Sequence, residues 1–166
     1  MTRSEVFLNA GDFYFHRPDA QQLTPVVVRT LLGSCVSVVL WHPEQRLGGM
    51  CHCVLPTRSQ SYGPLDGNHC EGAMRLFMQE LHRTATVARS YRTFLLGGAR
   101  MSLGMQNAQR TSVGERNVEA FRKLLHDAGF KICAEHVGLS GPRRVEFNLS
   151  TGRIDLMHGN QINQLA

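Results

Sequence analysis

The sequence predicts an α/β domain in which helices cover the faces of a β-sheet. Three observations support this fold. Apolar, β-branched runs bounded by turn residues recur along the chain and are typical of strands. Two segments carry apolar residues at helical spacing. The 166 residues fit one domain, 1–166, which is long enough to bury a substantial core.

The first third of the chain contains four strand-like segments, three before a single turn and one after it. In order they are an aromatic piece at 12–15, a β-branched run that begins at Val26, a run at 36–41 and a run at 47–55. The second and third runs are separated by Gly33-Ser34, and residues 42–46 form the turn. We therefore expect both runs before the turn to form a hairpin with 47–55.

The rest of the chain alternates helices with strands. Residues 57–70 are rich in Ser, Gly, Pro and Asn and indicate a surface loop, and 71–83 show the apolar spacing of an amphipathic helix. Ser112 with Glu115 is a capping box that predicts the start of a second helix, which Gly129 ends. Further strands are expected at 94–96, 130–136, 145–149 and 154–156.

Composition excludes several classes of protein. The chain is 42% hydrophobic and 19% charged, as in a soluble globular protein rather than a disordered one. Eighteen basic and thirteen acidic side chains give a net charge of +5. The basic residues are scattered, with no basic stripe and interleaved aromatics, so no nucleic-acid role is expected. No apolar run approaches a membrane span, and the N-terminus lacks the pattern of a signal peptide, so no membrane insertion is expected.

The cysteines indicate a reducing compartment. There are five, at irregular spacing, at positions 35, 51, 53, 70 and 133. An odd, irregular set is typical of free thiols rather than of a disulfide framework, and it predicts a cytoplasmic protein.

Cys35 and His52 are a candidate nucleophile and base. Cys35 lies where the Gly33-Ser34 turn leads into an apolar strand, and such a turn exposes a thiol beside free backbone N–H groups. A nearby imidazole takes the thiol proton and later returns it to a leaving group. On spacing alone, a packed core cysteine and a buried structural histidine are alternative interpretations. His69 is a rival base.

A zinc site is a second interpretation of the Cys51-His52-Cys53 cluster, completed by Cys35, Cys70 or His69. Successive side chains of a strand point to opposite faces, so Cys51 and Cys53 cannot share one ion with His52 on a regular strand. We therefore expect two buried structural thiols, no metal and no cofactor.

Five blocks of sequence resemble one family along nearly the whole chain. They are Thr30-Leu31-Leu32-Gly33-Ser34-Cys35, Gly49-Met50-Cys51-His52-Cys53-Val54-Leu55-Pro56, Gly97-Gly98-Ala99-Arg100-Met101, Val113-Gly114-Glu115-Arg116-Asn117-Val118-Glu119 and Arg144-Val145-Glu146-Phe147-Asn148 with Thr151-Gly152. In this order they resemble the bacterial chemoreceptor glutamine deamidase CheD.

The resemblance implies a layered sandwich of mixed β-sheet flanked by helices, a CheD-like cysteine hydrolase fold. It implies that glutamines of methyl-accepting chemotaxis receptors are converted to glutamate through a Cys–His thioester mechanism. Cys35 would attack the amide carbon, and His52 would move the protons. Gly33 and Ser34 would border the oxyanion site, which the Cys35 N–H would serve, aided by the N–H or hydroxyl of Ser34.

The third catalytic residue departs from the family pattern. The family has a threonine six positions before the cysteine, and Arg29 stands there in this chain, with Thr30 one position closer. A guanidinium has donors only, so Thr30 is the better partner for His52. Strand alternation directs Thr30 to the other face, and we therefore expect a bulge or turn between residues 28 and 33.

The segment that the resemblance assigns to partner binding also differs from the family pattern. The resemblance gives Gly98, Ala99 and Met101 as a surface for a CheC-type phosphatase, but Ser102 stands where the family commonly has Phe. An adaptor that regulates such a phosphatase is the alternative function, and receptor methylesterase activity is an accessory one. Arg144 and Glu146 alternate onto one strand face, which predicts a structural ion pair.

Overall fold

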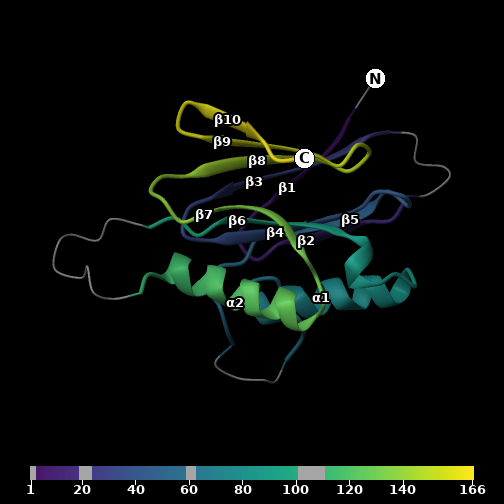
Figure 1. The fold of residues 1–166 in the computed structure, drawn as a ribbon, viewed down its shortest axis with the longest axis horizontal. Coiled ribbons are helices and arrows are strands. Elements are labelled where there is room, and N and C mark those ends of the chain that lie inside the picture. Colours follow the sequence, from purple (N-terminus) through teal and green to yellow (C-terminus); the bar gives the residue numbers. More distant parts are fainter. Residues whose placement is uncertain (1–2, 19–23, 59–62, 101–110) are drawn as a thin grey trace.

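Two mixed β-sheets and two helices stack as three layers in the computed structural model, which describes residues 3–18, 24–58, 63–100 and 111–166 (Figure 1). Sheet A has the strand order β1 (Ser4–Leu8), β3 (Val26–Leu32), β8 (Arg143–Asn148), β9 (Arg153–His158) and β10 (Gln161–Gln164). Sheet B has the order β2 (Phe13–His16), β5 (Leu47–Cys51), β4 (Val36–His42), β6 (Arg92–Gly97) and β7 (Ile132–Val137). Helices α1 (Cys70–Arg83) and α2 (Val113–Asp127) form the third layer, and η1 (Ala88–Ser90) is a short 3₁₀ turn.

Sheet B is the central layer and is buried on both faces. The side chains of Val36, Val38 and Leu40 belong to the core shared with the helices. Val39 and Met50 belong to the core between the two sheets, together with residues of β3, β8 and β9. A strand buried on both faces is apolar at most positions, which explains why β4 is apolar without interruption from Val38 to Trp41.

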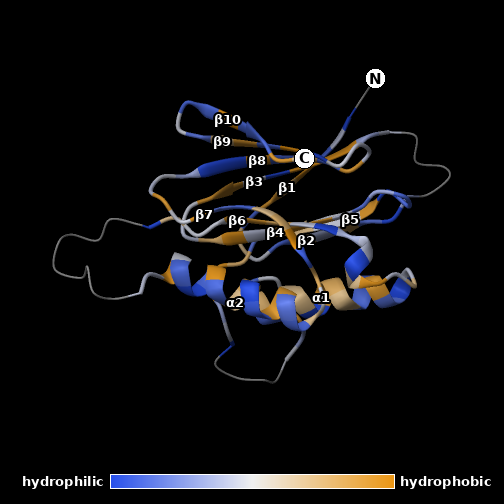
Figure 2. Cartoon of the chain, viewed as in Figure 1, coloured by the Kyte–Doolittle hydropathy of each residue, from blue (hydrophilic) through white to orange (hydrophobic). Residues whose placement is uncertain are grey.

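Local signals in the sequence set the limits of α2. The Ser112 hydroxyl accepts from the Glu115 N–H at 3.1 Å, and the Glu115 carboxylate accepts from the Ser112 N–H at 2.9 Å, which confirms the predicted capping box. Gly129, at φ 82°, follows the helix, as expected for a C-terminal glycine. Figure 2 shows hydrophobic and hydrophilic residues alternating along both helices, as their position on sheet B requires.

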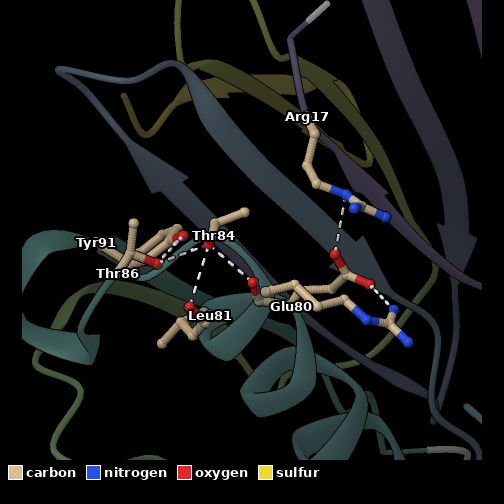
Figure 3. Close-up of polar contacts among 7 residues, drawn as sticks. Arg17, Glu80, Leu81, Thr84, Thr86 and Tyr91 are labelled. Atoms are coloured by element: carbon tan, nitrogen blue, oxygen red, sulfur yellow. Dashed lines mark hydrogen bonds and ion pairs between the residues drawn. The ribbon is translucent and has the colours of Figure 1, made fainter.

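The C-terminal end of α1 is tied to the segment that leads into β6. Glu80, which is buried, forms ion pairs with Arg17 at 3.3 Å and with Arg83 at 2.7 Å (Figure 3). The Thr84 hydroxyl donates to the Glu80 carbonyl at 2.8 Å and lies 3.0 Å from the hydroxyl of Thr86. These contacts hold the C-terminal end of α1 against the segment that leads into β6.

The layered α/β sandwich is confirmed, and the structure corrects three details of it. Both helices lie on sheet B, so the outer face of sheet A carries no helix within the described residues. The expected hairpin forms only between β4 and β5, because β3 belongs to sheet A. Glu146 pairs with Arg29 at 2.9 Å rather than with Arg144. None of the helices in the described ranges is long and apolar enough to cross a membrane.

Candidate active site

The Cys35 loop crosses from one sheet to the other. β3 ends at Leu32 in sheet A, and β4 begins at Val36 in sheet B, so Gly33, Ser34 and Cys35 bridge the two layers. The Gly33 carbonyl accepts from the Ala99 N–H at 2.9 Å, and the Cys35 carbonyl accepts from the Gly98 N–H at 2.8 Å. The loop is therefore held against the end of β6.

Strand register brings Cys35 and His52 to one face of sheet B. Val36 and Cys53 form an antiparallel bridge with backbone hydrogen bonds of 3.0 and 2.8 Å, and both side chains belong to the helix-side core. Alternation then directs Cys35 and His52 toward sheet A, as diagonal neighbours across the two strands. Diagonal Cβ atoms are on the order of 7 Å apart, within reach of long side chains. Among the described residues, the thiol and the imidazole do not form a direct hydrogen bond.

Thr30 holds the His52 ring from the opposite sheet. Its hydroxyl oxygen lies 2.8 Å from His52 Nδ1 and 2.8 Å from the Leu8 carbonyl oxygen. A carbonyl only accepts, so the hydroxyl donates to Leu8 and accepts from the His52 Nδ1–H. The ring proton is thereby assigned to Nδ1, and Nε2 is left as the basic nitrogen.

The expected bulge before Gly33 is absent. β3 pairs with β8 residue by residue from Val27 to Leu32, with no shift of register. Thr30 points between the sheets like Val28 and Leu32, while Arg29 points outward and pairs with Glu5 at 2.8 Å. The prediction was wrong because β3 and β4 were treated as strands of one sheet. The two strands belong to different sheets, and the Gly33-Ser34 bend changes direction between them.

Burial keeps both candidate groups neutral. Burial raises the pKa of the Cys35 thiol, and the backbone N–H of the same residue lowers it less. Burial lowers the pKa of His52, against smaller opposing effects of the Leu8 carbonyl and the Asp12 carboxylate. A neutral thiol therefore faces a neutral imidazole, and the thiolate has to form by proton transfer to His52 during attack.

The residues named for partner binding are only partly described. Met101 lies outside the described residues. Gly98 is buried at φ 66°, and an added Cβ there would lie 2.5 Å from the Val118 side chain. Ala99 is 1% exposed. Gly98 and Ala99 thus hold the Cys35 loop through their N–H groups, a structural role that the sequence did not indicate.

Three other cysteines lie on the opposite face of sheet B, and His69 is paired with a carboxylate. Cys51 and Cys53 have sulfurs 3.7 Å apart and, with Cys70, are buried in the core beneath the helices, on the other face from His52. In the ranges that the structure describes, no three His, Cys, Asp or Glu side chains are arranged to hold a metal ion. His69 Nδ1 lies 3.1 Å from an Asp66 carboxylate oxygen.

The structure also shows a residue to which the sequence assigned no role. Asn117 of α2 is fully buried and donates through Nδ2 to the carbonyls of Ser34 and Val54. These carbonyls lie one residue before Cys35 and two residues after His52. Asn117 stands in one of the blocks that carry the family resemblance, but a helix position alone does not reveal which loops it reaches.

Residues 54–158 match the family model described as CheD chemotactic sensory transduction. A Dechloromonas aromatica protein named probable chemoreceptor glutamine deamidase CheD 3 is 40% identical over 90% of this chain and 85% of its own length. This chain belongs to the CheD family. A Thermotoga maritima relative named chemoreceptor glutamine deamidase CheD is 37% identical over 78% of this chain and 80% of its own length.

Similarity to solved structures is more remote. A Bacillus licheniformis structure titled hypothetical protein YfiH matches 78% of this chain and 50% of that chain, with a TM-score of 0.45 and 13% identity. That similarity is too low to inform the function, which has to be inferred from the CheD family and from the geometry of the Cys35 site.

Proposed function

We propose that this chain is a protein-glutamine deamidase that converts glutamine side chains of methyl-accepting chemotaxis receptors to glutamate. The observation that carries the proposal is the Thr30–His52 hydrogen bond of 2.8 Å, which fixes the tautomer of a histidine that lies diagonally across from Cys35 on the same sheet face. In a member of the CheD family, that arrangement supports cysteine-dependent hydrolysis of the amide that the names of its relatives specify.

The reaction divides into two acyl transfers. His52 Nε2 takes the Cys35 proton as the sulfur bonds to the glutamine Cδ, and the amide oxygen becomes an oxyanion beside the Cys35 N–H. The tetrahedral adduct collapses, the C–N bond breaks, and His52 returns the proton to the departing ammonia. Water then gives a proton to His52 and attacks the thioester, which releases glutamate and the Cys35 thiol.

We also propose that the catalytic unit is one domain of residues 1–166, that it acts in the cytoplasm, and that it associates with a CheC-type phosphatase. Gly98 and Ala99 are buried, so an exposed contact for the phosphatase would have to come from neighbours such as Met101. A pull-down with a Met101→Ala variant tests this, because loss of binding is expected if Met101 makes the contact and unchanged binding contradicts it.

Mass spectrometry of a receptor cytoplasmic fragment tests the deamidase proposal. Replacement of an amide NH₂ by OH adds about one dalton per site, through the hydrolysis described above. The wild type is expected to produce this shift at defined glutamines, and Cys35→Ala is expected to produce none. Cys133→Ala is the matched control, because Cys133 is an exposed cysteine on β7 and should leave conversion unchanged.

Two outcomes would contradict the proposal. Conversion by Cys35→Ala at the wild-type rate would exclude Cys35 as nucleophile. Absence of conversion by the wild type, with retained binding to a CheC-type phosphatase, would favour the adaptor alternative. A methyl-esterified receptor fragment in the same assay tests the accessory methylesterase activity, since the same thiol attack on an ester releases methanol instead of ammonia.

A further inference from the structure

The carbonyls of the Cys35 loop are all occupied. The Gly33 carbonyl accepts from Ala99 N–H at 2.9 Å and the Cys35 carbonyl accepts from Gly98 N–H at 2.8 Å. The Ser34 carbonyl accepts from Asn117 Nδ2 at 3.3 Å. Two of these three bonds come from the backbone and persist whatever the side chain. Only the bond to Ser34 has a side-chain donor, so it is the one that a substitution of its donor residue removes.

The Ser34 carbonyl fixes the direction of the Cys35 N–H. In a trans peptide the C=O and the following N–H point in opposite directions within one plane. The Ser34 carbonyl is directed at α2, and therefore the Cys35 N–H is directed away from the helix layer. The Cys35 side chain lies on the same side of this peptide, because it packs against the core between the two sheets. A donor beside the sulfur is where an oxyanion forms during acyl transfer.

The second hydrogen bond of Asn117 links this peptide to the base. Nδ2 also donates to the Val54 carbonyl at 2.9 Å, on the segment that carries His52. One amide nitrogen therefore spans the nucleophile loop and the base strand. Asn117 is fully buried, and its Oδ1 has no hydrogen-bond partner among the described residues. Both N–H groups of the Asn117 amide donate and, within the described part of the chain, its oxygen is not used, so the side chain acts here only as a donor. An aspartate carboxylate at this position would repel both carbonyl oxygens.

We propose that Asn117 is a positioning residue that holds the Ser34–Cys35 peptide so that the Cys35 N–H serves the oxyanion. This inference rests on the proposed cysteine chemistry, but not on the identity of the substrate. Asn117 does not touch the reacting atoms, and its effect passes through the orientation of one peptide plane.

The test compares two reactions of the same thiol. Acylation of Cys35 by p-nitrophenyl acetate passes through a tetrahedral oxyanion, whereas alkylation by iodoacetamide is a direct displacement without one. Both are measured in a Cys133→Ser background, since Cys133 is exposed, whereas Cys51, Cys53 and Cys70 are buried and Cys35 is half-buried. Asn117→Ala and Asn117→Asp are expected to slow acylation on the order of 10²-fold, the effect of losing one oxyanion donor, while alkylation stays near the wild-type rate.

Leu125→Ala is the matched control for stability. Leu125 is also fully buried on α2 but packs in the helix-side core. It is expected to lower the melting temperature and to leave both reactions unchanged. Equal losses of acylation and alkylation in the Asn117 variants would reduce Asn117 to a structural role, and unchanged acylation would overturn the proposal.

The same assay separates this inference from the proposed function. If the wild type acylates at Cys35 but does not deamidate a receptor fragment, the proposed substrate is wrong, and the Asn117 comparison is still decided by p-nitrophenyl acetate. If wild-type Cys35 does not acylate, both ideas fail.

Discussion

The Thr30 hydroxyl selects the imidazole nitrogen that carries a proton, because it donates to the Leu8 carbonyl and accepts from His52. Thr30→Val keeps the shape of the side chain and removes the acceptor. We expect turnover to fall at least about tenfold, since a general base in the wrong tautomer loses much of its contribution. The measurement is kcat for the receptor fragment, with ¹⁵N NMR of the His52 ring to report the tautomer.

Arg29→Ala is the control for Thr30, because the Arg29 side chain leaves the opposite face of the same strand. The kcat of the Arg29→Ala variant should equal that of the wild type. Equal kcat for Thr30→Val and wild type, with an unchanged ring tautomer, would remove Thr30 from the catalytic group.

The raised pKa of Cys35 predicts how the thiol reacts with pH. Because burial favours the thiol, the rate of alkylation by iodoacetamide should keep rising beyond pH ~8.5, where an ordinary cysteine begins to level off. The rate profile should be measured in the Cys133→Ser background. Cys133 is exposed and would otherwise compete for the reagent. A plateau at neutral pH would show a preformed thiolate and contradict the neutral pair.

At the scale of elements, the junction of α2 with the Cys35 loop depends on Gly114. An added Cβ there would lie 2.6 Å from the carbonyl carbon and oxygen of Gly98, on the segment that clamps Cys35. Alanine usually stabilises a helix interior by about 1 kcal/mol over glycine. Here Gly114→Ala should instead lower the free energy of unfolding by about 1–3 kcal/mol, as overpacking does. Urea unfolding measures it.

The same clash should also disturb the Cys35 loop. Gly114→Ala displaces the partner of the Gly33 and Cys35 carbonyls, so acylation of Cys35 should slow as well. Gly159→Ala is the control for acylation, because nothing lies within 4 Å of its added Cβ, and the backbone strain at its φ of 58° does not reach the Cys35 loop. A Gly114→Ala variant that is more stable than wild type would show that the helix can move away without cost.

The sequence predicted those helices and strands whose pattern involves residues close together in the chain. The capping box of α2 and the apolar period of α1 depend on residues three or four positions apart, and both helices were found. β1 and β10 were missed because they are short edge strands of sheet A with exposed apolar residues, Phe7 and Ile162. The division of β3 and β4 between two sheets was missed because strand pairing is a long-range property that alternation does not encode.

In the candidate site, too, local patterns were recognised and long-range contacts were missed. Cys35 and His52 were named from the sequence because a local pattern displays their chemistry, and Thr30 was named from the resemblance to the CheD family. Asn117 was not, because its contacts with Ser34 and Val54 span 83 and 63 residues.

For the whole molecule, buried neutral histidines should make stability depend on pH. Burial lowers the pKa of His52 and of His136, and His136 also faces the cation Arg143 and the ring of His158. Below pH ~6.5 the unfolded chain binds these protons before the folded one, so the free energy of unfolding falls as the pH falls. Above that pH the contribution is fully present.

Urea unfolding at about pH 7.5 and about pH 5.5 measures this loss. His136→Gln keeps an acceptor for the Arg143 Nε–H and cannot titrate, so the loss between the two pH values should be smaller in this variant. An equal loss in the variant and in the wild type would exclude His136 as a source of the pH dependence.

The central claim is that the Cys35 sulfur is acylated by a glutamine side chain, and an acid-quenched reaction with the receptor fragment tests it most directly. Peptide mass spectrometry should find the Cys35 peptide joined to a receptor peptide, with a combined mass lower by about 17 daltons for the lost ammonia. The account predicts this adduct at Cys35 in the wild type and its absence in Cys35→Ala, together with loss of the glutamate product. An adduct on another cysteine, or undiminished glutamate formation by Cys35→Ala, would contradict it.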